Sequence, residues 1–182
     1  MELLVAGENV EPALLAEVSA LGHPSRVLGV FRREDLPRPA LLPDIGLALW
    51  HVGDPGNVGT LIRSADALGP AFVALSDGSA DPTGPKALRA SMGALFRVPL
   101  VRFDEASGRR VALVAHGGVR PAELDVSGPT TFVLGAEREG LPEDVLATCE
   151  ERVTIPLAPG SESLNVAAAG AIALYELRRR AG

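Results

Sequence analysis

Short apolar runs alternate with helix-period segments along most of this chain, and this alternation restricts the fold more than any other feature of the sequence. Several runs are apolar almost throughout, which is typical of strands covered on both faces of a parallel sheet. The runs are Leu3–Ala6, Val27–Phe31, Leu47–Val52, Phe72–Leu75, Val111–Ala115, Thr131–Leu134 and Val153–Leu157. The helical segments between and after them are Pro12–Ala20, Val58–Leu68, Pro85–Met92, Glu143–Glu150 and Val166–Arg180. The pattern predicts an α/β fold with a mostly parallel sheet and helices on both of its faces.

A proline-rich stretch at residues 32–44 interrupts the alternation. It contains Pro37, Pro39 and Pro43 and few helix-forming residues, which is typical of a linker. We therefore predict two parts: a short N-terminal β-α-β extension with its linker, residues 1–44, and a main domain, residues 45–182.

Composition excludes several classes of protein. Cys149 is the single cysteine, so there is no disulfide framework and a reducing cytoplasm is expected. The apolar runs are too short to span a membrane, and no basic segment of the kind that starts a signal peptide follows Met1. The histidines and Cys149 lack metal-ligand spacing, so we expect no metal site. There is no G-x-S-x-G motif to support a serine hydrolase.

The balance of charge argues against a general nucleic-acid binder, because the formal net charge is −6 and the pI is near 5.1. All seventeen basic side chains except Lys86 are arginines, and they are grouped along the chain. Arginine offers planar, bidentate donation to phosphate, but solvent-facing surfaces explain such groups equally well. Composition alone leaves both interpretations open.

The first of three unusual loops follows the strand that ends at Val52 and reads "GDPGNVGTLIRSADALG". Asn57 is a good N-cap residue, and we expect it to start the next helix. Leu61 and Ala65 fall on the core face of that helix, whereas Arg63 lies off it and can turn toward the loop. The glycines do not form the G-x-G-x-x-G dinucleotide fingerprint, and no phosphate-binding P-loop is present. A capped turn beside a solvent-facing arginine explains this segment as well as a binding site does.

The second loop follows the apolar run at residues 131–134 and reads "GAEREGLP". Gly135 ends the strand, where the missing side chain lets a ligand approach the backbone. Glu137 follows two residues later. In open parallel sheets, ligands bind beyond the carboxyl ends of the strands, where this loop must lie. An ordinary strand-to-helix turn is the alternative.

The third loop, "APGSESLNV", precedes a C-terminal helix rich in alanine and glycine. Ser163 or Asn165 can cap that helix, and its N-terminus attracts anions. Close packing of small residues explains the helix itself. It does not explain why Ser161, Glu162 and Ser163 precede the helix.

In this order, the three segments resemble the motifs of the SpoU (TrmH-like) family of SPOUT-class RNA methyltransferases. "DPGNVGTLIRSADALG" is similar to the first motif, "FVLGAEREGLP" to the second and "IPLAPGSESLNVAAAGAIALYE" to the third. The segment "DPTGPKALRASMGALFRVPL" is similar to the region between the first two. The resemblance covers about residues 46–177, and residues 1–44 look like a shortened substrate-binding extension, a possible RNA-binding remnant. Gly53, Pro159 and Ser161 depart from the family pattern.

The resemblance implies a SPOUT fold with a deep C-terminal trefoil knot, an exception to the rule that chains are unknotted. It implies a homodimer that binds S-adenosyl-L-methionine (SAM), with each active site completed across the interface. It also implies that the enzyme transfers a methyl group to a ribose 2′-hydroxyl of a structured RNA, either tRNA or rRNA.

Carried over position by position, the resemblance also implies roles for individual residues. The expected catalytic residues are Asn57, Arg63, Glu137, Ser163 and Asn165. The expected cofactor-binding residues are Ala115, Gly135, Ile155, Leu157 and Leu164. The expected RNA-binding residues are Lys86 and Arg89.

Other functions remain open from the sequence alone. The family proposal makes Arg63 the base, but guanidinium groups stay protonated, so binding phosphate or stabilising an alkoxide is the cheaper role. A non-catalytic RNA- or SAM-binding module on the same fold is an alternative. A nicotinamide-dependent dehydrogenase suits the α/β pattern but lacks the fingerprint.

Overall fold

The computed structural model describes residues 2–19 and 25–181, and its internal contacts divide the chain into two compact units. The units are Met1–Leu36 and Pro37–Gly182. This division falls within the stretch that the sequence identifies as a linker. None of the helices in the described residues is long and apolar enough to cross a membrane.

The first unit is an antiparallel strand pair with one helix. Its elements are β1 (Glu2–Val5), α1 (Pro12–Val18), β2 (Val27–Val30) and the 3-10 helix η1 (Arg33–Asp35). Leu15 is its only buried large hydrophobic residue among those described. The predicted helix Pro12–Ala20 ends at Val18, and Ala20 lies outside the described residues.

The second unit holds a six-stranded sheet in the order β5-β4-β3-β7-β6-β8, in which every neighbouring pair is parallel. Its strands are β3 (Ile45–Leu49), β4 (Phe72–Leu75), β5 (Leu100–Arg102), β6 (Arg109–Leu113), β7 (Thr130–Leu134) and β8 (Glu151–Val153). Its helices are α2 (Pro55–Leu68), α3 (Pro85–Ser91), η2 (Ala94–Phe96), η3 (Phe103–Glu105), α4 (Glu143–Leu146) and α5 (Val166–Ala181). The predicted mostly parallel α/β sheet is confirmed.

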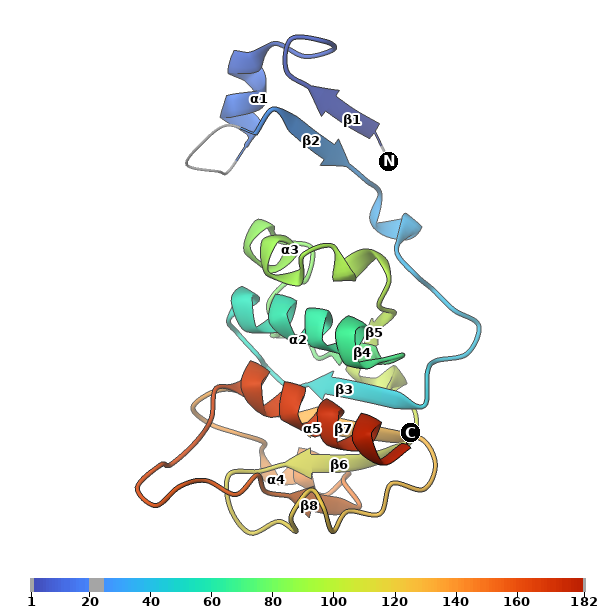
Figure 1. The fold of residues 1–182 in the computed structure, drawn as a ribbon, viewed down its shortest axis with the longest axis vertical. Helices are drawn as coiled ribbons and strands as arrows, with labels where there is room; N and C mark the ends of the chain where they lie inside the picture. The colour runs from blue at the N-terminus through green and yellow to red at the C-terminus, as the bar shows by residue number, and fades with distance from the viewer. Residues whose placement is uncertain (1, 20–24, 182) are drawn as a thin grey trace. The chain divides into compact units, whose positions relative to one another are not determined.

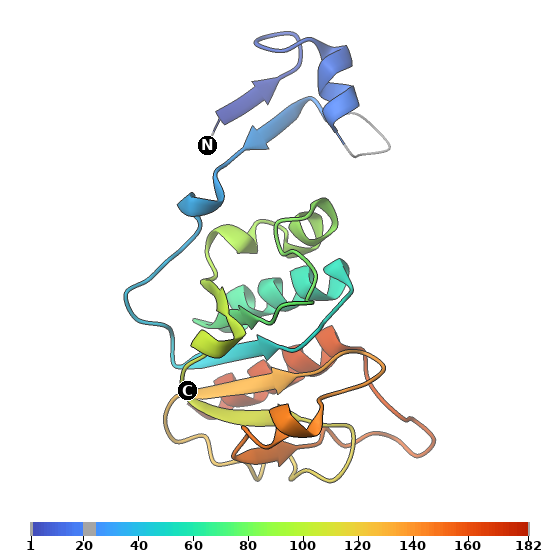
Figure 2. The same ribbon diagram turned by 180° about the vertical axis from the view of Figure 1, so that it is seen from behind.

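Helices cover both faces of this sheet, and Figures 1 and 2 show the two sides. On one face, Gly170 of α5 lies against Leu61 of α2 and Leu134 of β7. On the other, Ala48 and Val133 share a buried cluster with α4. Because the central strands β3 and β7 are buried on both faces, their sequences are apolar except for Thr130 and Thr131, whose hydroxyls donate to backbone oxygens. Helix α3 packs on α2.

Two predicted elements of the second unit end four residues earlier than expected. The predicted strand Val153–Leu157 is wrong beyond Val153, because Pro156 has no N–H to donate and the outer side of β8 meets an isolated bridge at Val119 rather than a full strand. The predicted helix Glu143–Glu150 ends at Leu146. The three-residue strand β5 was not predicted, since so short a run carries no periodicity.

Candidate active site

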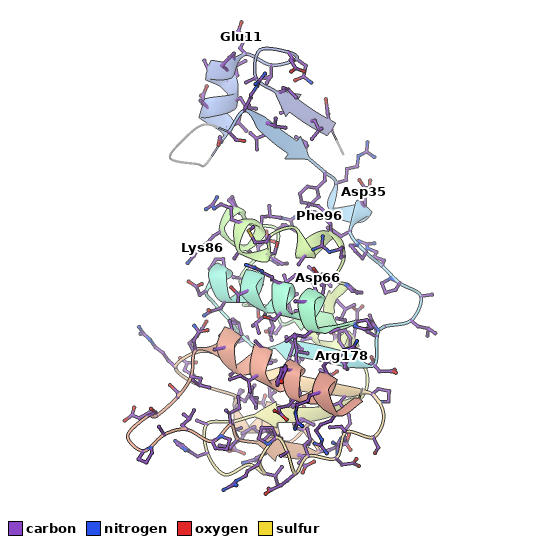
Figure 3. The ribbon with its side chains drawn as sticks, in the orientation of Figure 1. Glu11, Asp35, Asp66, Lys86, Phe96 and Arg178 are labelled. Atoms are coloured by element: carbon purple, nitrogen blue, oxygen red, sulfur yellow. The ribbon has the colours of Figure 1, made fainter. Side chains whose placement is uncertain are left out.

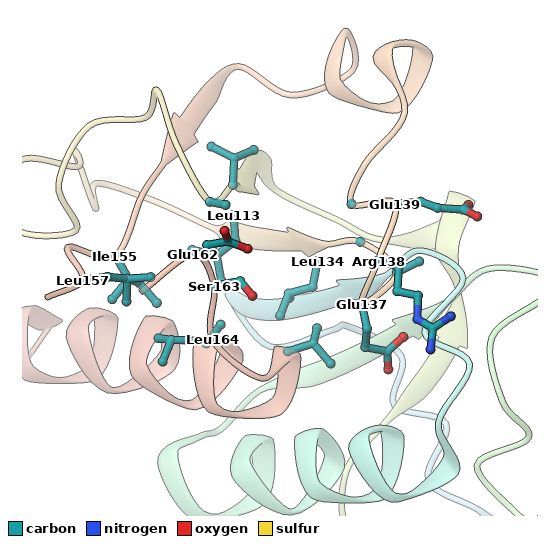
Figure 4. Close-up of a pocket in the computed structure, with 17 residues that line it drawn as sticks. Leu113, Leu134, Glu137, Arg138, Glu139, Ile155, Leu157, Glu162, Ser163 and Leu164 are labelled. Carbon is teal, nitrogen blue, oxygen red and sulfur yellow. The ribbon is translucent and has the colours of Figure 1, made fainter. Parts of the chain in front are cut away.

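A cavity of about 430 Å³ opens beyond the carboxyl ends of β6 and β7. Its walls come from the ends of these strands, the loop after β7, the loop after β8 and the start of α5. Figure 4 shows Glu162, Ser163 and Leu164 on one side of the cavity and Glu137, Arg138 and Glu139 on the other. Segments far apart in the sequence therefore share one pocket.

All five residues expected to bind the cofactor line this cavity. They are Ala115, Gly135, Ile155, Leu157 and Leu164. The irregular backbone after Val153 places Ile155 and Leu157 in the wall, so the absence of a strand there contributes to the pocket. At Gly135, a Cβ atom would lie 2.6 Å from the backbone nitrogen of Leu141 and closer still to the backbone of Gly140. Only glycine therefore fits at this bend.

Three of the five expected catalytic residues form a continuous hydrogen-bonded set. The Asn57 side-chain amide donates to Glu137 Oε1 over 2.9 Å, and the Asn165 amide donates to Asn57 Oδ1 over 3.0 Å. Asn165 Oδ1 in turn accepts from the backbone N–H groups of Ala167 and Ala168, at 2.9 and 3.2 Å. Asn165 thus caps α5, one of the two candidates for that position. Because both ends of its amide are bonded, its orientation is fixed.

The remaining two expected catalytic residues lie apart from this set. Ser163 lines the cavity on the side opposite Glu137, whereas Arg63 does not line it. The Arg63 side chain is exposed on α2, and within the part of the chain that the structure describes it has no hydrogen bond or ion pair. The chain therefore places Glu137 and Ser163 in the cavity wall and links Asn57 and Asn165 to Glu137 by hydrogen bonds. Arg63 lies outside this arrangement.

The predicted N-cap of α2 is wrong. Asp54, not Asn57, caps the helix: its Oδ1 accepts from the N–H groups of Gly56 and Asn57 at 2.7 and 3.0 Å, and the helix begins at Pro55. An aspartate followed by proline is itself a helix-start signal, which the sequence offered. The consequence is that the Asn57 side chain is released from capping and is free to bind Glu137.

The two residues expected to bind RNA lie on α3, and both are exposed. Lys86 Nζ donates to Asp54 Oδ2 over 2.6 Å. This hydrogen bond, together with that from Asn57 N–H, holds the pKa of Asp54 below its ordinary value. Within the described part of the chain, the Arg89 side chain has no hydrogen bond or ion pair.

Sequence reasoning missed some of the charged residues of the cavity. Glu139, Arg138 and Glu162 line it, and each lies next to or within two residues of an expected site residue. Their closeness in the sequence to expected site residues could have identified them as residues of the cavity. No group of His, Cys, Asp or Glu suited to a metal ion occurs among the residues the structure describes.

Comparison with known proteins gives a consistent family assignment. The family model for the SpoU rRNA Methylase family matches residues 44–175. A 23S rRNA (guanosine(2553)-2′-O)-methyltransferase of Bacillus subtilis, RlmP, is 40% identical over 72% of this chain and 57% of its own length. A 23S rRNA (uridine(2479)-2′-O)-methyltransferase of Streptomyces viridochromogenes is 34% identical over 93% of this chain and 66% of its own length. The chain thus spans slightly more than half to about two thirds of these relatives.

Solved structures agree in fold. The AdoMet-bound rRNA methyltransferase of Sinorhizobium meliloti superposes with a TM-score of 0.71 at 35% identity, covering 77% of this chain and 57% of that one. The family model covers well over half of the residues, in the region that holds the sheet and the cavity. This chain belongs to the SpoU rRNA methylase family.

Proposed function

We propose that this protein transfers a methyl group from SAM to a ribose 2′-hydroxyl of tRNA or rRNA. The observation that carries the proposal is the cavity at the carboxyl ends of β6 and β7. All the expected cofactor residues line it, and the Asn57, Glu137 and Asn165 set meets beside it. The two rRNA 2′-O-methyltransferases that resemble the chain support the reaction, and the AdoMet-bound neighbour supports the cofactor.

The cavity fits SAM in size and chemistry. Its volume lies within the range of about 300–1,000 Å³ that is usual for small-molecule sites. Leu113, Leu134, Ile155 and Leu157 offer apolar walls for an adenine ring. Gly135 allows the backbone of Gly140 to approach closely, which gives the cavity wall its bend. Carboxylates at the rim match the positive charge of a sulfonium and of an amino group.

Methyl transfer from SAM requires the protein mainly to align the acceptor oxygen with the methyl group. SAM, when bound, supplies a methyl group on a sulfonium centre, and the acceptor oxygen must lie in line with the carbon–sulfur bond that breaks. The bonded set of Asn57, Glu137 and Asn165 is rigid enough to orient groups beside the cavity. Ser163 lies within reach as a hydroxyl donor or acceptor toward the RNA.

We assign Arg63 the stabilisation of charge on the RNA, at the adjacent phosphate or at the 2′-oxygen as it loses its proton. A guanidinium remains protonated in proteins, so it suits this role better than that of a base. Because Arg63 is exposed and lies outside the cavity of its own protomer, we propose that it acts in the active site of a second copy. Exposed Ile172 and Tyr175 on α5 supply apolar surface for such a homodimer.

Three further features belong to the same proposal. A deep trefoil knot would form from the C-terminal segment, which leaves edge strand β8 and returns to pack on α2. Residues 1–44 would be a short extension that contacts RNA, while residues 45–182 hold the catalytic machinery. The protein would act in the cytoplasm on structured RNA.

Replacing Arg63 tests the reaction and the assignment together. Arg63→Ala should abolish methyl transfer while calorimetry with SAM shows nearly unchanged affinity. Arg152→Ala, an exposed arginine on β8, serves as the matched control and should keep its activity. Unchanged turnover in Arg63→Ala would remove Arg63 from the mechanism. SAM binding by the wild-type protein without any transfer would favour the binding-module alternative.

Mixing two inactive variants tests whether Arg63 acts across the dimer. Dimers that combine Arg63→Ala with Ser163→Ala carry both defects in one site and none in the other, if Arg63 acts on its partner. Random mixing should then restore about a quarter of wild-type activity. If Arg63 acts in its own protomer, mixing restores nothing.

A further inference from the structure

Two ion pairs tie helix α2 to the segment that contains α3 and η2. At the N-terminal end of α2, Lys86 Nζ lies 2.6 Å from Asp54 Oδ2. Nearer its C-terminal end, Arg97 Nη2 lies 2.6 Å from Asp66 Oδ2, and Figure 3 labels Lys86 and Asp66. The Lys86 and Arg97 side chains are equally exposed, at 59% each. Arg97 donates to both oxygens of Asp66, whereas Lys86 donates to one oxygen of Asp54, and only the Lys86 pair adjoins the active site.

The first pair continues directly into the active-site hydrogen bonds. Asp54 uses its second oxygen, Oδ1, to accept from the N–H of Asn57. The Asn57 side chain then donates to Glu137 and accepts from Asn165. An unbroken series of bonds therefore runs from α3, through the first turn of α2, to the loop after β7 and to the cap of α5.

We propose that Lys86 is a positioning residue: its ammonium group holds Asp54, and through it the first turn of α2, so that the Asn57 amide stays against Glu137. This inference rests on the proposed methyl transfer for its kinetic consequences. It replaces the expectation that Lys86 binds an RNA phosphate. Arg89, one turn further along α3, retains that expectation.

The chemistry of the pair favours this role. Lys86 is the only lysine among seventeen basic residues, at a position where a single carboxylate oxygen is available because the other caps the helix. A compact ammonium suits one oxygen, whereas a guanidinium is built for two. Gly56 leaves room for the contact: a Cβ there would lie 2.7 Å from Asp54 Oδ1 and 3.4 Å from Lys86 Cε. The lysine also lowers the pKa of Asp54, which keeps the cap charged.

Kinetics of three variants distinguish positioning from phosphate binding. Lys86→Met and Asp54→Asn should each lower kcat by about two- to fivefold, the effect of losing one exposed ion pair, with the KM for RNA and its salt dependence unchanged. Asparagine keeps the cap, so Asp54→Asn removes mainly the charge. Because both substitutions remove the same Lys86–Asp54 ion pair, the double variant should be no slower than either single variant. Arg97→Met, the matched control, should keep wild-type kcat.

A phosphate contact predicts the opposite pattern. Lys86→Met would then raise the KM for RNA and reduce its salt dependence, while Asp54→Asn would free the lysine and lower the KM. Either result would overturn the inference.

Hydrogen exchange tests the inference without any activity. In RNA-free protein, the amides of residues 56–58 should exchange faster in Lys86→Met than in wild type or Arg97→Met, because Asp54 anchors all three. Equal exchange in Lys86→Met and wild type would contradict the proposal. If the wild-type protein transfers no methyl group, the proposed function fails and the exchange experiment alone decides the role of Lys86.

Discussion

Gly59 is the position where the packing of α2 on α3 can be tested most sharply. It is buried in α2, and a Cβ atom there would lie 2.7 Å from the Cβ of Ala90 and closer still to the backbone oxygen of Ala87. The obstructing atoms belong to the backbone and Cβ of α3, which have no rotamers through which to yield. Gly59→Ala therefore has to push the two helices apart.

The magnitude follows from two opposing terms. Alanine gains about 1 kcal/mol over glycine in a helix interior. Overpacking a filled core costs about 1–3 kcal/mol, and the rigid obstruction at Gly59 indicates the upper end of that range. The expected net loss is about 2 kcal/mol, which lowers the Tm by about 4–8 °C for a chain of this size.

Thermal and urea unfolding of Gly59→Ala check this estimate, with Gly53→Ala as the control. At Gly53 a Cβ would meet no atom within 4 Å, so its unfolding free energy should stay within about 0.5 kcal/mol of wild type. A Gly59→Ala variant as stable as wild type, or more stable by the helix-propensity term alone, would refute the close packing of α2 on α3.

Three further predictions concern the active site. Gly135→Ala should abolish SAM binding measured by calorimetry, since its Cβ would collide with the backbone at Gly140; normal affinity would show that the bend is not required. Asn165→Asp keeps an acceptor for the cap of α5 but loses the donor to Asn57, so this variant should lose activity with little change in Tm. Asn165→Ala should lose activity and also about 1 kcal/mol of stability. Equal Tm values for the two variants would argue against the cap. The lowered pKa of Asp54 stabilises the folded protein above the ordinary carboxyl pKa of about 3.9, and this stabilisation is lost as the pH falls through the lowered pKa of the folded state. Acid titration should therefore show that the difference in unfolding free energy between wild type and Asp54→Asn closes below about pH 4. A difference that stays constant with pH would contradict this prediction.

The sequence predicted the sheet because strands that are buried on both faces have continuous apolar runs that are easy to recognise. Strands β3 and β7 lie at its centre and are mostly apolar, so their runs were clear. Edge strands carry less information. β8 ends at Val153, shortly before Pro156, and its outer side forms an isolated bridge with Val119 rather than a full strand pair. The three residues of β5 are too few for a periodic pattern.

The expected site residues came from motif resemblance, and their mutual contacts could not be read from the sequence. Asn57 and Asn165 are 108 residues apart, and only the fold places their side chains 3.0 Å from each other. The same limit explains Lys86, whose partner Asp54 lies 32 residues earlier. Arg63 differs in kind: its side chain has no hydrogen bond or ion pair among the described residues, and we propose that it acts on a second copy of the chain.

The most direct test of the proposed function is analysis of the product nucleosides. Purified protein is incubated with methyl-labelled SAM and unmodified tRNA or rRNA, and the RNA is digested to nucleosides for mass spectrometry. The proposal predicts label in a 2′-O-methylated nucleoside, and no label when Arg63→Ala replaces the wild-type protein. Label on a nucleobase, or no label from a protein that binds SAM, would contradict it.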